Sequence, residues 1–361
     1  MLGKQPIFRG ALLGLAVGDA MGHAVDGKSL DEIRNDYGPN GLLGYDLVNG
    51  YAEVTSYTQV AAFAANGLLL GLTRGNTELL VRYMGLALRE WSRSQQFSEP
   101  ERNYCWLSRV PELKRRRCMD TRMLDALSRE TLGTLENPVY RSSQPGALTG
   151  AIPVALLSGI LEMEPDALDR MGAEAVALTH GDPLAFLSGA ALTHALCLLM
   201  RQPDISAQEL LQDTVDSVQL QFGREYGQTT AVWELLQLAM TLAASEETSQ
   251  MEAMELLRCR TAPEVLAGAL YACVTCHGDF DAAMITAVNH SGRSAAVGAI
   301  TGAVLGIRLG EQILPEFYLE CLEPAELLRE LADDLAQGNP TDRVSHLFDD
   351  DWDRKYLHGG V

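Results

Sequence analysis

Apolar residues recur every third or fourth position along most of the chain, which is the spacing of helices that bury one face. Sustained alternation of apolar and polar residues, which is typical of strands, is absent from the sequence. The expected helices cover residues 8–26, a short segment from 29, 55–70, 76–95, 121–129, 146–159, 165–178, 183–200, a segment from 206, 229–243, 263–276, 280–288, 294–310 and 324–337. The pattern therefore predicts an all-α protein.

Two of the expected helices carry glycine at every fourth position. Residues four apart lie on one helical face, where missing side chains let a second backbone approach closely. Each glycine costs about 1 kcal/mol against alanine inside a helix, so close packing has to offset that loss. We therefore expect the two helices to cross in the core, with the polar residues at their ends facing one pocket. The glycines are Gly10, Gly14 and Gly18 in the first helix and Gly298, Gly302, Gly306 and Gly310 in the second.

Capping side chains predict where several helices begin. A serine, threonine or asparagine before a helix accepts a hydrogen bond from a free backbone NH group. A glutamate three residues later completes a capping box. The expected caps are Thr55, Asn76 and two capping boxes, Ser29 with Glu32 and Ser206 with Glu209.

Composition favours one soluble domain. The chain has 361 residues, 47% of them apolar, and no linker rich in Pro, Gly or Ser divides it. We expect a domain over residues 1–338 and an acidic tail over residues 339–361. The N-terminus lacks a charged region followed by a cleavable apolar segment, and the longest apolar runs are shorter than the ~20 residues that span a bilayer. These features predict a cytoplasmic protein without membrane contact.

The charge of the chain argues against nucleic acid as a partner. A net charge of -20 makes the general surface repel phosphate backbones. One basic run, Lys-Arg-Arg-Arg at 114–117, is interpreted as a solvated loop or helix face in preference to an anion site.

The cysteines indicate reduced thiols. Seven cysteines, an odd number, fit buried thiols better than a disulfide framework. The Cys-Val-Thr-Cys-His string at 273–277 matches a haem-attachment pattern, but it continues an apolar helix. Buried helix residues are therefore favoured there over haem or zinc ligands.

Three polar residues beside glycines are candidate site residues. His180 lies in a Thr-His-Gly-Asp-Pro string, where a histidine is either a helix C-cap or part of a site. Asp19 and Asp26 lie at the end of the first apolar helix, where a carboxylate either solvates the helix end or lines a site. The residues alone leave both alternatives open.

Together these segments resemble the ADP-ribosylglycohydrolase family. The glycine-rich string at 10–22 is similar to the family's first motif, the string at 179–183 to its central motif, and residues 287–302 frame its last one. The resemblance covers residues 8–336 and implies a compact, single-domain, orthogonal helical bundle. It also implies hydrolysis of ADP-ribosyl glycosidic bonds with two magnesium ions. Aspartates of a Thr-Asp-Asp-Thr string and a Gly-Gly-Asp-Ser/Thr-Asp-Ser/Thr string hold these ions in the family, since hard cations need several oxygen ligands.

The present chain departs from both metal-binding strings. The first reads Thr-Ser-Tyr-Thr at 55–58 and the second Ser-Gly-Arg-Ser-Ala-Ala at 291–296, so all four aspartates are replaced. Arg293 introduces a guanidinium, which repels a cation. Asp26 stands where the family usually has glutamate, whereas His180 is retained. We therefore expect no magnesium cofactor and no metal ligands.

The leading hypothesis is a pseudoenzyme that binds ADP-ribose, a related nucleotide or an ADP-ribosylated protein without hydrolysing it. Arg293 then pairs with Asp19 or Asp26, contacts a phosphate or ribose diol, or forms a purely structural salt bridge. A second hypothesis is a metal-independent glycohydrolase, with Asp26 as general base or nucleophile and Arg293 supplying positive charge. A third is a scaffold without a ligand, in an oligomer or a complex. The expected pocket residues are Asp26, Thr55, Ser56, Tyr57, His180, Asn289, Arg293 and Ser294.

Overall fold

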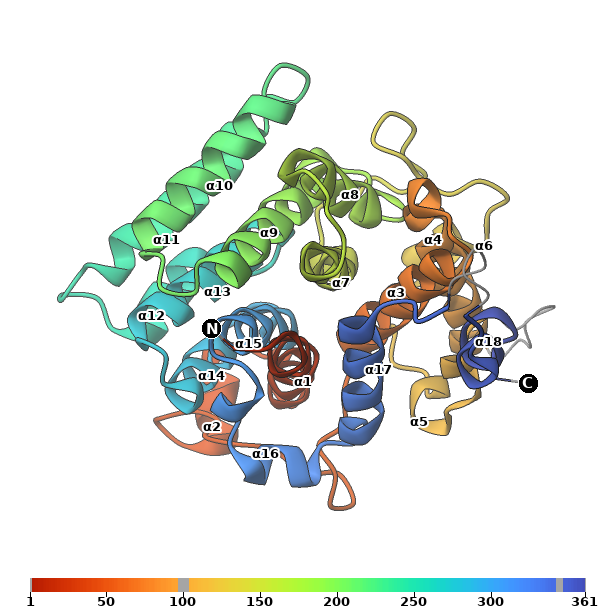
Figure 1. Cartoon of the computed structure of the whole chain (residues 1–361). Coiled ribbons are helices and arrows are strands. Elements are labelled where there is room, and N and C mark those ends of the chain that lie inside the picture. The colour runs from red at the N-terminus through yellow and green to blue at the C-terminus, as the bar shows by residue number, and fades with distance from the viewer. Residues whose placement is uncertain (1, 97–103, 342–346, 361) are drawn as a thin grey trace.

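Two glycine-rich helices cross at the centre of the fold. They are α1 (Lys4–His23) and α15 (Ser294–Leu309), which lie against one another in Figure 1. A Cβ atom added to Gly302 would lie 1.9 Å from the carbonyl oxygen of Gly14, and one added to Gly306 would lie 1.9 Å from that of Gly10. The two helices therefore meet through their backbones, which confirms the crossing that the glycine spacing predicted.

The structure is a computed structural model that describes residues 2–96, 104–341 and 347–360. Within these ranges the chain forms eighteen α-helices, and extended pairing is limited to the isolated bridges Val48–Tyr51 and Ala52–Leu322. The other α-helices are α2 (Leu30–Tyr37), α3 (Ser56–Thr73), α4 (Leu80–Gln95), α5 (Pro111–Lys114), α6 (Thr121–Ser128), α7 (Ala151–Leu156), α8 (Pro165–Ala177), α9 (Pro183–Arg201), α10 (Ala207–Phe222), α11 (Thr229–Ala243), α12 (Gln250–Leu257), α13 (Ala262–Thr275), α14 (Phe280–Val288), α16 (Glu316–Cys321), α17 (Ala325–Gln337) and α18 (Asp350–Leu357). Short 3-10 helices are η1 (Thr77–Leu79), η2 (Trp106–Arg109), η3 (Pro145–Gly150), η4 (Leu157–Gly159) and η5 (Glu311–Ile313). The all-α prediction is confirmed.

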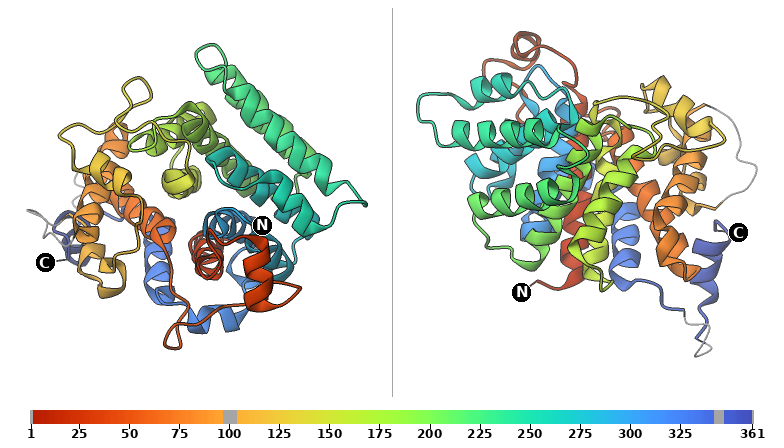
Figure 2. Two further views of the ribbon diagram at one scale, coloured as in Figure 1. Left: turned by 180° about the vertical axis from the view of Figure 1, so that it is seen from behind. Right: turned by 90° about the horizontal axis from the view of Figure 1, so that it is seen from above.

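The remaining helices surround the central pair. α17 and α3 pack on one side of it, and α13 and α14 pack on the other (Figure 1). α8 packs against α9, and the α10–α11 hairpin forms an outer edge of the molecule. Figure 2 shows the same arrangement from behind and from above. The ends of α1, α3 and α15 are thereby brought together at one end of the core.

Most of the predicted caps are confirmed. In both capping boxes, those of Ser29 and Ser206, the hydroxyl accepts a hydrogen bond from the third NH of the helix and a glutamate reaches back. Thr55 caps α3 through its side chain. The prediction that the Asn76 side chain caps a helix is wrong. This side chain donates a hydrogen bond to the Tyr83 hydroxyl at 3.2 Å instead. A 3-10 turn, η1, follows it and delays the start of α4.

The acidic tail contains a helix that the sequence analysis did not predict. The Asp349 carboxylate caps α18 by accepting from the Trp352 NH at 2.9 Å. Trp352 and Tyr356 are buried on one face of α18, and the Trp352 indole donates to Thr73 Oγ1 at 2.9 Å. The described part of the tail is thus packed on α3, while residues 342–346 and 361 lie outside the described residues.

Other differences concern short helices. The periodicity did not reveal α12 and α16, which have few turns and therefore little pattern. The helix expected over 146–159 is divided into η3, α7 and η4. Pro153 lies in the first turn of α7, where its missing NH group is not needed.

One helix has the length and composition of a membrane span. α9 has 19 residues and a mean hydropathy of 1.7. The prediction that every apolar run is too short to span a bilayer is therefore wrong for this helix. The polar residues Thr193 and His194 interrupt the run in the sequence without lowering its average much. In the described residues 72% of this stretch is buried inside the molecule, where α9 packs against α7, α8, α10 and α13. A core helix of a soluble protein has the same features.

Candidate functional site

A cavity of about 560 Å³ lies where the C-terminal end of α1 meets the N-terminal ends of α3 and α15. Of the predicted site residues, Asp26, Thr55, Ser56, Tyr57 and Arg293 line it. The polar ends of the crossing helices therefore face one pocket, as their sequence predicted.

Asp19 fastens α3 to α1 beneath this cavity. Its carboxylate accepts hydrogen bonds from the Thr55 NH at 2.9 Å and hydroxyl at 2.6 Å, and from the Thr58 NH at 3.0 Å and hydroxyl at 2.5 Å. Asp19 is fully buried, and this burial raises its pKa while the hydrogen bonds from Thr55 and Thr58 oppose the rise. The α3 turn that presents Ser56 and Tyr57 is thus held in place by one side chain.

Replacing Asp19 by asparagine is expected to lower the free energy of unfolding by about 2 kcal/mol, because the amide offers one acceptor oxygen in place of two and the hydrogen bonds that remain lose their charge. Urea unfolding at neutral pH measures the change. Asp31→Asn, at an exposed position of α2, is the control and should stay within about 0.5 kcal/mol of the unmodified protein. Equal stability of the Asp19 variant would contradict the role given to its charge.

Asp26 and Arg293 form an ion pair on the cavity wall. Arg293 Nη1 lies 3.6 Å from Asp26 Oδ2, and Asp26 Oδ1 accepts the Ala295 NH at 3.1 Å. Burial raises the pKa of Asp26, and the Ala295 NH and the Arg293 charge oppose this rise. The Arg293 side chain is 46% exposed, so much of its guanidinium remains accessible. Of the two partners considered for Arg293, the structure selects Asp26, while Asp19 is occupied by Thr55 and Thr58.

Tyr57 forms part of the same wall. Its backbone carbonyl accepts a hydrogen bond from the Thr149 hydroxyl at 2.8 Å, which ties the first turn of α3 to η3. Burial raises the pKa of the Tyr57 phenol, with the Asp26 charge adding to the shift. Tyr57 therefore stays neutral and offers the cavity an aromatic surface.

His180 lies behind the cavity. The side chain is fully buried, its Nδ1 is 2.9 Å from the Thr179 hydroxyl, and its Nε2 is 3.6 Å from Asp120 Oδ2. Among the described residues Nε2 has no hydrogen-bond partner. Gly146 separates it from the cavity, since a Cβ there would lie 3.1 Å from Nε2. His180 therefore does not line the cavity itself, but it lies next to Asp120, whose side chain does.

The two remaining predicted residues do not line the cavity. Asn289 is buried and exchanges hydrogen bonds with the backbone of Leu42, at 2.8 and 2.9 Å, so it holds the loop before α3. Gly41 is required beside it, because its φ is +70° and a Cβ would lie 2.0 Å from Asn289 Oδ1. Ser294 is also fully buried, with its hydroxyl 3.4 Å from the His290 carbonyl.

Several lining residues were missed by the sequence analysis. They come from loops, from the end of α1 and from the first turn of α6, where no motif marks them, although Asp120 has a recognisable role as the cap of α6. Burial opposes ionisation of Asp120, but His180 and the backbone NH groups of Met123 and Arg122 hold its pKa below the usual range. The missed residues with charged or aromatic side chains are His23, Arg117, Asp120, Arg122 and Tyr140.

The basic run is less solvated than predicted. Arg117 is only 11% exposed and pairs with Glu53 at 2.5 Å and with Glu323 at 3.5 Å. Arg115 pairs with the same two glutamates, at 3.1 and 2.5 Å. Two arginines and two glutamates thus form one network, which places Arg117 in the cavity wall.

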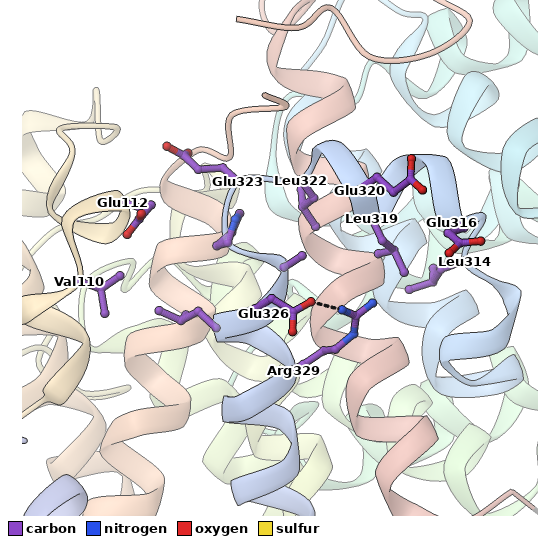
Figure 3. A pocket seen from close by; sticks show the side chains of 13 residues that line it. Val110, Glu112, Leu314, Glu316, Leu319, Glu320, Leu322, Glu323, Glu326 and Arg329 are labelled. Carbon is purple, nitrogen blue, oxygen red and sulfur yellow. Dashed lines mark hydrogen bonds and ion pairs between the residues drawn. The ribbon is translucent and has the colours of Figure 1, made fainter. Parts of the chain in front are cut away.

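Glu323 also faces a second cavity of about 540 Å³, between α5, α16 and α17 (Figure 3). Five of the side chains that line it are glutamates, and Glu326 pairs with Arg329 there (Figure 3). None of the predicted site residues lines it. The network of Arg115, Arg117, Glu53 and Glu323 therefore lies between this acidic cavity and the candidate site, whose lining contains both arginines and aspartates.

The chain belongs to the ADP-ribosylglycohydrolase family, whose model matches residues 4–344. It is 26% identical over 333 residues to an uncharacterized protein of Archaeoglobus fulgidus, and the match covers 90% of this chain and 94% of that protein. A solved structure of an ADP-ribosylglycohydrolase-related protein complex is similar with a TM-score of 0.61 and 21% identity, over 94% of this chain and 100% of that one. At this identity the structural likeness shows the fold alone. The family resemblance and the all-α fold are thereby confirmed.

The oxygen donors in the cavity do not fit the family's pair of magnesium ions. The Thr55 hydroxyl is used by Asp19 and the Tyr57 NH, and Arg293 brings a positive charge within 3.6 Å of Asp26. Among the described residues no group of three or more His, Cys, Asp or Glu side chains is placed to hold a metal ion. Hard cations need several oxygen ligands, and the two carboxylates that line the cavity, Asp26 and Asp120, belong to no such group. What the arrangement offers is guanidinium, carboxylate, hydroxyl and aromatic groups for binding a polar ligand.

Proposed function

We propose that this protein binds ADP-ribose, or an ADP-ribosylated partner, in the cavity at Arg293, and that it has lost the dinuclear magnesium centre and with it metal-dependent hydrolysis. One observation carries the proposal. The Arg293 guanidinium lies in the cavity wall, 3.6 Å from Asp26, at a position where the family's motif has a metal-binding aspartate. A cation fixed there opposes metal binding and attracts a phosphate or a ribose diol.

The lining chemistry supports a nucleotide of this kind. Arg122 and Arg293 line the cavity together with Arg117, whose terminal nitrogens pair with glutamates. The planar fork of an arginine matches phosphate oxygens, so Arg122 and Arg293 are the candidate phosphate ligands. Tyr57 and Tyr140 add aromatic surfaces for a base or a ribose. The cavity volume of about 560 Å³ falls among those of small-molecule sites.

His180 supports a polar contact in the same place. Buried polar atoms in folded proteins almost always have a hydrogen-bond partner. His180 Nε2 has none among the described residues and lies 3.6 Å from the Asp120 carboxylate, too far for a direct hydrogen bond. A ligand hydroxyl or a water molecule is therefore expected to bridge the two side chains.

A second candidate function is metal-independent hydrolysis of an ADP-ribosyl bond. The observation that favours it is the environment of Asp26, whose pKa is raised by burial while its carboxylate still lines the cavity. A carboxyl group with a raised pKa is suited to general acid–base catalysis near neutral pH. The scaffold hypothesis is less well supported, because neither Tyr57 nor the Arg293 ion pair fills the cavity.

Calorimetric titration with ADP-ribose, in excess magnesium and again in EDTA, tests the proposal. We expect binding that is the same in both conditions. Arg293→Gln is expected to weaken it about 10- to 150-fold, since a hydrogen bond to a charged group contributes about 1.5–3 kcal/mol. Arg116→Gln is the matched control, because Arg116 is exposed in a neighbouring loop and does not line the cavity.

The same samples separate the two candidate functions. Incubation with an ADP-ribosyl-arginine substrate should give no free ADP-ribose if the protein only binds. Turnover in EDTA that Asp26→Asn abolishes would favour hydrolysis without metal. Binding or turnover that requires magnesium would overturn the proposal, as would the absence of binding in both conditions.

A further inference from the structure

A third cavity, of about 430 Å³, lies away from the candidate site, between α9, α10, α13 and α15. α10 forms its outer wall, and the hairpin of α10 and α11 occupies the outer edge of the fold (Figure 1). The side chains of α9 and α13 leave room because several are small, among them Ala191, Ala195 and Ala269. No residue of this cavity lines the cavity at Arg293.

The walls of this cavity are aliphatic. Leucine, isoleucine, valine and alanine side chains dominate, and among the described residues that line it the imidazole of the exposed His277 is the single ring. The Cys273 thiol adds no charge, because burial raises its pKa to about 12. Apolar walls without Phe, Tyr or Trp side chains suit a flexible aliphatic chain better than a nucleotide base, which binds by stacking and hydrogen bonding.

An arginine, Arg308, lies at the mouth of this cavity. Arg308, in the last turn of α15, lines the cavity, and its Nε donates to the Pro203 carbonyl at 2.8 Å. This bond orients the guanidinium and leaves its two terminal nitrogen atoms for another acceptor. No carboxylate of the described residues lies within ion-pair distance of it; Asp204 also lines the mouth but is exposed to solvent. A planar pair of donors matches the two oxygens of a carboxylate.

We propose that this cavity binds a straight-chain aliphatic monocarboxylate, with its chain among α9, α10, α13 and α15 and its carboxylate on Arg308. Apolar walls and one oriented guanidinium at the mouth are complementary to such a ligand in both polarity and charge. The site is separate from the cavity at Arg293, so the proposal stands or falls independently of ADP-ribose binding.

Side-chain contacts fasten α10, the outer wall, to the helices of the core. His194 of α9 bonds to Asp213 of α10 at 2.7 Å, and Ser217 of α10 donates to Asp169 of α8 at 2.7 Å. Because α10 is fastened at these points, the space behind it is retained rather than closed by collapse of the helix.

Calorimetric titration with octanoate, decanoate and dodecanoate, each below its micelle concentration, tests the proposal, with decan-1-ol as the uncharged counterpart of decanoate. We expect saturable binding of one ligand per chain and an affinity that rises about fourfold per methylene group until the cavity is full. Decanoate should bind at least tenfold more tightly than decan-1-ol.

Two variants locate the site. Arg308→Gln should weaken decanoate binding at least tenfold and leave decan-1-ol unchanged. Ala195→Phe, which fills the cavity, should weaken both ligands at least tenfold, and circular dichroism checks that each variant is folded. Arg293→Gln, in the other cavity, is the control and should change neither.

Three results would overturn the proposal. These are no saturable binding of any chain length, equal affinity for decanoate and decan-1-ol, and decanoate binding that folded Arg308→Gln retains in full. If Ala195→Phe does not fold, the Arg308 comparison alone still decides, because that side chain lies at the rim.

Discussion

Replacement of Gly302 by alanine is expected to lower the free energy of unfolding by at least about 3 kcal/mol, and replacement by leucine is expected to prevent folding. The Cβ of an alanine would lie 1.9 Å from the carbonyl oxygen of Gly14, well inside van der Waals contact. The obstacle is backbone on both sides, so no rotamer change relieves it, and α1 and α15 must separate along the centre of the core. This separation would also move the ends of both helices at the candidate site.

Urea unfolding followed by circular dichroism measures the effect. Gly150→Ala is the matched control, because a Cβ there meets only Val60 Cγ1 at an ordinary 3.7 Å. Gly227→Ala, with no atom within 4 Å of the added Cβ, controls for the change in backbone entropy. If Gly302→Ala were as stable as these two variants, the backbone contact between α1 and α15 would be incorrect.

Replacement of His194 by alanine is expected to lower the free energy of unfolding by about 3–5 kcal/mol, because it leaves a buried carboxylate without its counter-charge. Asp169 is fully buried, and its Oδ2 lies 2.7 Å from His194 Nδ1. The other ring nitrogen lies 2.7 Å from Asp213 Oδ1. Ser217 and Gln221 donate to the same oxygen of Asp169, at 2.7 and 3.0 Å, but neither supplies charge.

The effect of His194 should depend on pH. Burial lowers the pKa of this histidine, but the hydrogen bonds and charges of Asp169 and Asp213 outweigh it and raise the pKa above the usual value. A pKa that is higher in the folded than in the unfolded state stabilises the fold fully below about pH 6.5, the value of an unperturbed histidine. This contribution is lost as the pH rises through the raised pKa of the folded protein.

Urea unfolding at pH 6 and at pH 9 therefore gives a direct comparison. The difference in stability between the unmodified protein and His194→Ala should be largest at pH 6 and smaller at pH 9. His358→Ala, at an exposed histidine after α18, should differ little from the unmodified protein at either pH. A His194 effect that grows toward pH 9 would contradict the assignment of a charged histidine between two aspartates.

The spacing of residues along the chain was enough to predict the framework of this protein. Helical periodicity predicts the long helices, and the serine capping boxes fix the starts of α2 and α10. Glycines at every fourth position predict that α1 and α15 cross, because only hydrogen atoms then separate their backbones. These features depend on residues within a few positions of one another, so a sequence contains them directly. Short helices such as α16 and α18 lack the repeats from which a period is recognised.

The same local motifs predicted part of the candidate site. Asp26, Thr55, Ser56, Tyr57 and Arg293 lie at the ends of predicted helices, and the crossing brings those ends to one cavity. The resemblance to the family's two metal-binding strings also identified the replaced aspartates, since each position of those strings can be compared with residues 55–58 and 291–296 of this chain.

Only the tertiary structure decided which side chains face that cavity and what charge it contains. Arg117 lines the cavity because it pairs there with Glu53 and Glu323, which are far apart in the sequence. Asp120 lines the cavity from the start of α6. Asn289 and Ser294 are turned into the protein instead. Ion pairs and side-chain orientations of this kind depend on distances between segments remote along the chain, which are set when the helices pack and which no local pattern of residues encodes.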